Sequence, residues 1–385
     1  MRAGFRFDAR KRFQPFRQKQ EGVRESGQHS RVTRLFRQPT TFIIGAGASY
    51  ELGLPLGEGL KGSIADILNI RYDYSRQISG DYQIAQECKA ASQENSERSW
   101  DNYIEACWLL RDALPAAISI DNLMDAHQGN KYVELVGKMA IVKSIWEAER
   151  ESALFPIIKD SERFEISAIS SSWLIPFFQI LTENVKLGEI EDLFQNVSFI
   201  VFNYDRCLET FLPHALRNYY GIEINEAHRI AEKAVIIHPY GSVGDTVNPR
   251  NPEHIPFGTD QKRYRNQSSN IRTFSEGLMH ETHGDKIKKI LKLSHQVIFL
   301  GFAFHPLNME ILTIDEDNFI RKVFATTLKL ATPAQRTVET EIKRIFNKPL
   351  TGRPDFQGHN KCLDELNLSG ETAHSFLNSY FRGIA

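Results

Sequence analysis

The sequence has few cysteines and no long apolar runs. Its 385 residues include 4 cysteines, and no two of them form a C-x-x-C pair. This scarcity predicts a reducing, cytoplasmic setting and excludes a zinc ribbon. Because the apolar runs are short and interrupted, we expect neither a transmembrane helix nor a secretory signal. A formal net charge of −1 with 25% charged residues is typical of an ordinary globular chain.

Positive charge gathers at the start of the chain. Residues 1–35 are rich in arginine and lysine, have few acidic residues and sustain no helical or strand period. We therefore expect a basic, flexible arm there. Such an arm either binds nucleic acid or another acidic partner, or is a solvated leader without a fold of its own. An organellar transit peptide is a further formal alternative.

The main feature of the sequence is a glycine-rich turn within residues 41–57, TFIIGAGASYELGLPLG. Apolar residues up to Ile44 predict a buried strand that leads directly into the turn and a helix start. Glycine has no Cβ, so a backbone of this kind can approach a phosphate closely. The usual dinucleotide fingerprint needs a third glycine where Tyr50 stands, and no Gly-Lys-Ser/Thr phosphate loop follows. The residues of the turn that we expect to contact a ligand are Gly45, Ala46, Gly47 and Ser49.

Five short apolar runs predict the strands of a mostly parallel sheet. Helical periods separate these runs, which indicates a doubly wound α/β fold. We expect one domain over residues 36–331, a helical insertion over about residues 59–188, and a helical C-terminal tail over residues 332–385. The predicted strands are residues 41–44, 197–202, 235–237, 296–300 and 323–326.

Glycine or polar segments follow four of these strands. They read GAGAS, NYD, HPYGS and GFAF in chain order. Open α/β sheets bind ligands at the carboxyl ends of their strands, so these segments predict a binding site. Taken singly, Asn203 and Asp205 could instead cap the next helix, and His238 could be an ordinary core or surface histidine.

The order and chemistry of these four segments resemble the sirtuin family, in which such elements surround NAD. The resemblance covers about residues 41–327. It is nearest to the bacterial sirtuin-like proteins of antiviral defence, which destroy NAD, and among them to those that pair with a hexameric HerA-type ATPase. It implies a sirtuin-like, Rossmann-type fold, NAD+ as substrate, no metal, a homo-oligomer and a HerA-type ATPase as possible partner. We expect no membrane partner and leave direct nucleic-acid binding open.

The resemblance also implies a reaction and a set of site residues. The reaction is hydrolysis of the nicotinamide–ribose bond of NAD+ to give nicotinamide and ADP-ribose. Asn203 would orient the ribose and the water, and His238 would act as the catalytic base. Asp205 would bind near the nicotinamide amide. The other expected NAD contacts are Gly45, Ala46, Gly47, Ser49, Leu54, Pro55, Gly301 and Phe302.

The sequence departs from the sirtuin pattern at two points. It lacks the paired cysteines of the zinc module in deacylating sirtuins, which disfavours deacylation. It also reads His238-Pro239-Tyr240-Gly241 where the family reads His-Gly, so alignment on the glycine would give Tyr240 the catalytic place. Two other functions stay open. One is a regulatory or scaffold subunit that binds NAD or ADP-ribose without hydrolysing it, and the other is a zinc-free deacylase.

Overall fold

The computed structural model describes residues 36–94, 99–159, 165–246, 251, 254–279, 281–314, 318–346 and 363–384. The basic arm expected over residues 1–35 lies outside these described residues.

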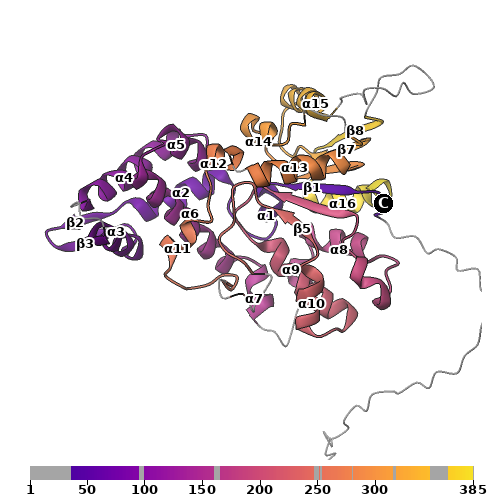
Figure 1. Ribbon diagram of the computed structural model, residues 1–385, viewed down its shortest axis with the longest axis horizontal. Helices are drawn as coiled ribbons and strands as arrows, with labels where there is room; N and C mark the ends of the chain where they lie inside the picture. Colours follow the sequence, from indigo (N-terminus) through magenta and orange to yellow (C-terminus); the bar gives the residue numbers. More distant parts are fainter. Residues whose placement is uncertain are drawn as a thin grey trace, which may run out of the picture. The chain divides into compact units, whose positions relative to one another are not determined.

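A six-stranded parallel sheet organises the described chain, in the order β5-β4-β1-β6-β7-β8 (Figure 1). From β1 the chain first builds one side of the sheet through β4 and β5, and then the other side through β6, β7 and β8. This is the strand order of Rossmann-like folds, and its switch point lies between β1 and β6. The strands are β1 Thr40–Ile44, β4 Val197–Val201, β5 Val235–Ile237, β6 Gln296–Leu300, β7 Lys322–Thr326 and β8 Glu365–Ser369.

The register confirms the predicted sheet. Ile43 of β1 pairs with Ile200 of β4 and with Phe299 of β6, and every neighbouring pair in this sheet is parallel. The sequence did not predict β8, so a wholly helical tail over residues 332–385 was wrong. The run Glu365–Ser369 is half-buried at the sheet edge and alternates polar with apolar residues. It therefore lacks the apolar run that marks a central parallel strand.

Helices cover both faces of the sheet, as a parallel sheet requires. Alternate side chains of β1 enter two cores: Ile43 faces one, and Phe42 and Ile44 face the other. The core around Ile43 contains α13 Glu281–Leu293 and α15 Thr332–Phe346. The opposite core contains α8 Leu174–Thr182, α9 Cys207–Tyr220, α10 Ile224–Ala231 and α16 Ala373–Ile384.

A mostly helical segment separates β1 from β4, as the sequence predicted. Its described residues within 57–151 lie beside the sheet, whereas α8 packs on one face of it (Figure 1). The segment also holds a two-stranded hairpin, β2 Arg71–Asp73 and β3 Arg76–Ser79, which the sequence did not predict. Its helices are α1 Ala46–Tyr50, α2 Gly57–Leu68, α3 Tyr82–Glu94, α4 Trp100–Ala113, α5 Ile120–Ala126, α6 Lys131–Glu151, α7 Leu154–Lys159 and α8. Shorter helices after β5 and β6 are α11 Tyr264–Ser268, α12 Phe274–Met279 and α14 Pro306–Ile311.

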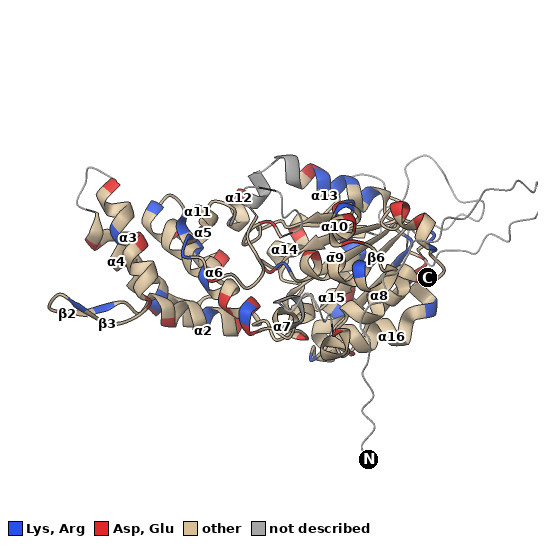
Figure 2. Cartoon of the chain, turned by 90° about the horizontal axis from the view of Figure 1, so that it is seen from below, with Lys and Arg blue, Asp and Glu red and all other residues tan. Residues whose placement is uncertain are grey.

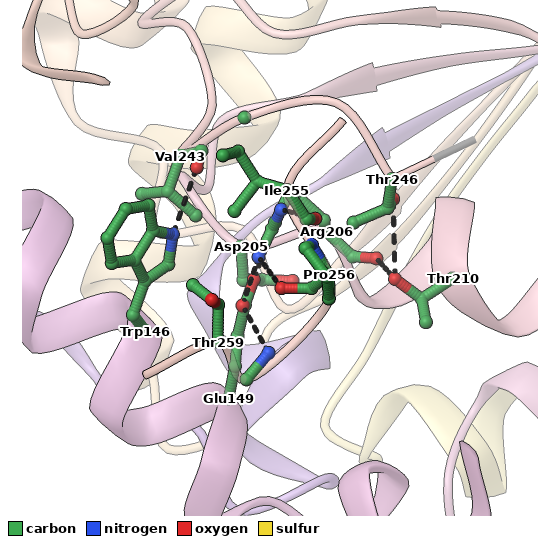
Figure 3. A network of polar contacts seen from close by, with 12 residues as sticks. Trp146, Glu149, Asp205, Arg206, Thr210, Val243, Thr246, Ile255, Pro256 and Thr259 are labelled. Carbon is green, nitrogen blue, oxygen red and sulfur yellow. Dashed lines mark hydrogen bonds and ion pairs between the residues drawn. The ribbon is translucent and has the colours of Figure 1, made fainter. Parts of the chain in front are cut away.

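A buried ion pair joins this insertion to the sheet. Glu149 near the end of α6 accepts hydrogen bonds from two nitrogens of Arg206, Nε at 2.9 Å and a terminal nitrogen at 2.5 Å (Figure 3). The Gly258 N–H donates to the same carboxylate at 3.0 Å, and Arg206 also donates to the Ile255 carbonyl at 2.7 Å. Both charged side chains are at most 1% exposed. Burial is the largest influence on the pKa of Glu149 and raises it, although Arg206 opposes that shift.

We predict that Glu149→Gln lowers the free energy of unfolding by about 3–5 kcal/mol, because it leaves the Arg206 charge buried without its partner. Urea denaturation followed by circular dichroism measures the change. Glu151→Gln is the matched control, since Glu151 is exposed on the same helix. Equal losses in the two variants would contradict the prediction.

Candidate functional site

A cavity of about 300 Å³ lies at the carboxyl ends of β1, β4 and β6. The strand ends form one wall, and residues of α2, α5, α6 and α14 complete it. Ligands of open α/β sheets bind beside the switch point, and this cavity is at the lower end of the usual size range for small-molecule pockets. The residues that were expected to contact NAD and that line the cavity are Gly45, Ala46, Leu54, Pro55, Asn203, Asp205 and Phe302.

Close packing of two turns explains the glycines after β1 and β6. A Cβ on Gly45 would lie 2.5 Å from the Gly301 carbonyl oxygen, and a Cβ on Gly301 would lie 2.0 Å from the Ala48 nitrogen. Gly301 also has a φ of +58°, which favours glycine. The Gly45 N–H donates to Leu300 at 3.0 Å and the Gly47 N–H to Gly301 at 2.9 Å. These two amides therefore bind the neighbouring turn, and Gly47 and Gly301 lie behind the cavity wall.

Ser49 connects the ends of β1 and β4. Its hydroxyl accepts from Asn203 Nδ2 at 2.9 Å and is hydrogen-bonded to the Asp205 carboxylate. Asp205 in turn accepts from the Cys207 N–H at 3.2 Å, so it also caps α9. Burial raises the pKa of Asp205, and the hydrogen bonds from Ser49 and Cys207 oppose that rise. Ser49 thus supports the site from behind, while it fixes the amide of Asn203 at the cavity wall.

Tyr240 lines the same cavity as Asn203. Its hydroxyl donates to Asn308 Oδ1 at 2.6 Å, and its ring packs edge-on against Phe202 with 5.9 Å between ring centroids. Burial raises the pKa of Tyr240 well above its ordinary value, and the charges of Asp121 and Asp125 raise it further. The phenol therefore stays protonated at neutral pH, and its proton is donated to Asn308.

The structure does not bring His238 into the cavity with Asn203. It lines a separate, more polar cavity of about 610 Å³ beyond β5. Its Nδ1 lies 2.8 Å from the Asn203 backbone carbonyl and its Nε2 lies 2.5 Å from Glu209 Oε1. Both partners accept hydrogen bonds, so both ring nitrogens donate, as in the imidazolium form. Burial alone would lower the pKa of His238, but the charge and hydrogen bond of Glu209 and the Asn203 carbonyl raise it overall.

The helical insertion contributes a site residue that the sequence did not reveal. Asp121 lies in the first turn of α5, where Ser119 caps the helix by accepting from the Asn122 N–H at 3.1 Å. The carboxylate lines the cavity and accepts a hydrogen bond from the Tyr204 hydroxyl. Burial raises its pKa to about 6, with the Tyr204 hydrogen bond opposing the rise. The only sequence signal was the helix-capping pattern, which gave no reason to place α5 against the strand ends.

Within the described residues, no three His, Cys, Asp or Glu side chains are grouped as metal ligands would be. Cys88, Cys107 and Cys207 are buried free thiols. No helix in this part of the chain has the length and apolar character needed to cross a membrane. The strand order and the cavity define a Rossmann-like α/β protein with a candidate ligand site at the switch point. No protein-family model matches the chain, and no curated protein matches it.

We predict that the imidazole of His238 titrates above its ordinary pKa and that Glu209→Gln lowers this pKa, because Glu209 supplies the main favourable charge. Proton–nitrogen NMR of the imidazole measures both. A histidine whose pKa is raised by folding adds stability at low pH and loses it as pH rises through the folded pKa. Glu209→Gln should therefore cost more stability near about pH 6 than near about pH 9.

Glu232→Gln is the control for this titration, because Glu232 lines the same cavity and is exposed. It should leave the pKa of His238 unchanged within error. A wild-type pKa below the ordinary histidine value would contradict the described hydrogen bonds.

Proposed function

We propose that the chain is an NAD+ glycohydrolase that releases nicotinamide and leaves ADP-ribose. The observation that supports this best is the convergence of Asn203, Asp205 and the Gly45 turn on one cavity at the switch point. Two of these residues come from the end of β4 and one from the end of β1. The same residues carry the resemblance to sirtuins, which is a separate line of support.

The walls of the cavity suit the nicotinamide half of the substrate. Leu54, Pro55 and Phe302 supply apolar surface for the ring, and Asp205 is placed to approach its amide. Cleavage of the nicotinamide–ribose bond builds positive charge on the ribose, so buried carboxylates nearby stabilise the transition state. Asn203, whose Nδ2 is held by Ser49, keeps its Oδ1 for the ribose or the attacking water. The rest of the dinucleotide would extend toward the opening of the cavity.

A second candidate is a subunit that binds NAD or ADP-ribose without hydrolysing it. The position of His238 favours this candidate, because the base expected from the resemblance lies in a different cavity and has both nitrogens hydrogen-bonded. Tyr240 occupies the cavity instead, and its raised pKa makes it unfit as a base. Hydrolysis through Asn203 and carboxylates remains our first proposal, since loss of nicotinamide from NAD+ needs no base before the bond breaks.

We predict that the purified chain releases nicotinamide from NAD+, alone or with its ATPase partner, and that Asn203→Ala lowers kcat at least about 10²-fold by misplacing ribose and water. Nicotinamide is quantified by chromatography. The control is Asn378→Ala, an exposed asparagine of α16 that should retain full activity. Binding of NAD+ without any nicotinamide release would favour the second candidate, and absence of binding would contradict both.

The same assay distinguishes the role of His238 from that of Tyr240. If His238 only holds the Asn203 carbonyl, His238→Ala lowers kcat but keeps the shape of its pH profile. Loss of one limb of the profile would instead restore His238 as a base. Tyr240→Phe removes the hydrogen bond to Asn308 and should act mainly on KM. If the Tyr240→Phe enzyme is inactive, Tyr240 is the catalytic residue of this segment.

We also propose that the chain acts in antiviral defence as an oligomer, with a HerA-type ATPase as partner. The resemblance suggests this role, and one surface feature supports association. The hairpin β2–β3 projects beyond α3 and α4 (Figure 2) and bears exposed apolar side chains. Tyr74 is 100% exposed, Ile78 60% and Tyr72 39%. Exposed apolar patches of this kind commonly mark protein interfaces.

We predict that the chain is larger than a monomer at micromolar concentration and that Tyr74→Ser combined with Ile78→Ser reduces its mass, because the hairpin loses its apolar surface. Light scattering coupled to gel filtration measures mass with and without a candidate ATPase. The control is Leu293→Ser, an apolar residue 54% exposed at the end of α13. A monomeric wild type in both conditions would contradict the proposal.

A further inference from the structure

The insertion-side wall of the cavity carries a single carboxylate in mainly apolar surroundings. Asp121 projects from α5 toward the strand ends, where Tyr204 donates a hydrogen bond to it. Lys61, Ser119 and Asn122 are the other polar residues on this side, and most of the remaining residues are aliphatic or aromatic. The apolar residues that line the cavity around it are Leu60, Ile118, Ile120, Ile145, Phe274 and Leu307.

The one lysine among the residues that line the cavity already has partners. Lys61 of α2 lines the cavity, but its Nζ donates to the Ala117 carbonyl at 2.7 Å and pairs with Glu58 at 2.8 Å. Within the described residues, Asp121 forms no ion pair with a basic side chain. The other titratable groups that line the cavity or act on Asp121 are Tyr204, Asp205 and Tyr240 from the strand-end loops, His305 before α14, and Asp125 on α5 itself.

An unpaired carboxylate in an apolar cavity is complementary to a flat organic cation. The ring of oxidised nicotinamide nucleotides is an N-substituted pyridinium and carries a positive charge, whereas the reduced dihydropyridine ring is neutral. Binding the cation would give the carboxylate the opposite charge that its surroundings lack. The apolar walls would meanwhile cover both faces of the ring.

We propose that Asp121 makes the cavity selective for the cationic, oxidised nicotinamide ring over the neutral, reduced ring. The inference rests on the proposed function, because it assumes that the nicotinamide half enters this cavity. Asp121 then acts as a specificity residue supplied by the insertion, while the strand-end residues position the ribose. A purely structural role of Asp121 as a first-turn residue of α5 would produce no dependence on ligand charge.

The preference for the oxidised ring should depend on pH, because only the ionised form of Asp121 attracts a cation. Asp121 has a pKa of about 6 in the free protein, so it is a carboxylate above that pH and neutral below it. A bound cation favours the ionised carboxylate and therefore lowers the pKa of Asp121 in the complex. The preference for the oxidised ring should therefore be full near about pH 8 and weaker near about pH 5.5.

The test compares binding of NAD+ and NADH by calorimetry in the Asn203→Ala background, which suppresses turnover. We expect NAD+ to bind about 10-fold more tightly than NADH near pH 8, a modest part of the Coulomb energy of a close ion pair. The ratio should fall at the lower pH. Asp121→Asn, made in the same background, should bring the ratio close to one at both pH values.

Asp125→Asn is the matched control. Asp125 is on the same helix, but its carboxylate accepts from the Ser275 N–H and does not line the cavity, so this variant should keep most of the preference. Thermal unfolding checks the fold. Because folding raises the pKa of Asp121, its ionised form opposes folding above about pH 6, so Asp121→Asn should not lower the melting temperature near pH 8.

A second pair of probes tests the ring alone and does not depend on dinucleotide binding. The cation 1-methylnicotinamide should shift NMR signals of the wild-type cavity at lower concentration than neutral nicotinamide does, and Asp121→Asn should remove this difference. The inference is wrong if the wild type binds both rings equally, or if Asp121→Asn leaves the ratio of NAD+ to NADH affinity unchanged. Either result would leave the proposed NAD site standing. Failure of the wild type to bind either dinucleotide overturns the proposed function, and the ring probes then decide on Asp121 separately.

Discussion

The site depends on the buried ion pair between Glu149 and Arg206. Glu149 lies near the end of α6, the longest described helix of the insertion, and Arg206 follows β4, so their contact joins the insertion to the strand ends. Burial raises the pKa of Glu149, and the charge of Arg206 opposes that rise. Such a pair adds little net stability compared with an apolar contact, but it allows few alternative arrangements, because either charge left alone in the interior is costly. It therefore defines where the insertion packs more than how strongly it packs.

This placement gives the cavity two walls of different origin. The strand-end wall rests on two packed turns, in which Gly45 and Gly301 approach more closely than any side chain would allow. The insertion wall is built from side chains of packed helices and brings Asp121 to the strand ends. A small shift of α6 would leave the first wall intact and change the second. Under the proposed function, the insertion would therefore determine which nicotinamide ring is accepted, and the sheet would determine the position of the ribose.

The sheet could be predicted from the sequence more fully than the site. Five strands stand out as apolar runs because both faces of a parallel sheet are buried, whereas the edge strand Glu365–Ser369 is half-buried and gave no such signal. The topology predicted a site at the strand ends, and the resemblance supplied most of the residues assigned to it. Asp121 could not be assigned to the site, because its contact with Tyr204 joins residues 83 positions apart and no local pattern encodes it. The sequence also could not show that the turn glycines pack against another turn. In a sequence, the same glycine pattern is equally consistent with close approach to a phosphate.

The segment after β5 separates the two residues that the sequence offered as the catalytic base. His238 and Tyr240 are two positions apart, but the glycine turn that follows β5 turns their side chains into different cavities. Gly241 has a φ of +76°, and a Cβ there would lie 1.7 Å from the Asn270 carbonyl oxygen, so this turn has one conformation that only glycine permits. The fixed turn places Tyr240 beside Asn203 and leaves His238 behind it. His238 remains connected to the site through its hydrogen bond to the Asn203 carbonyl.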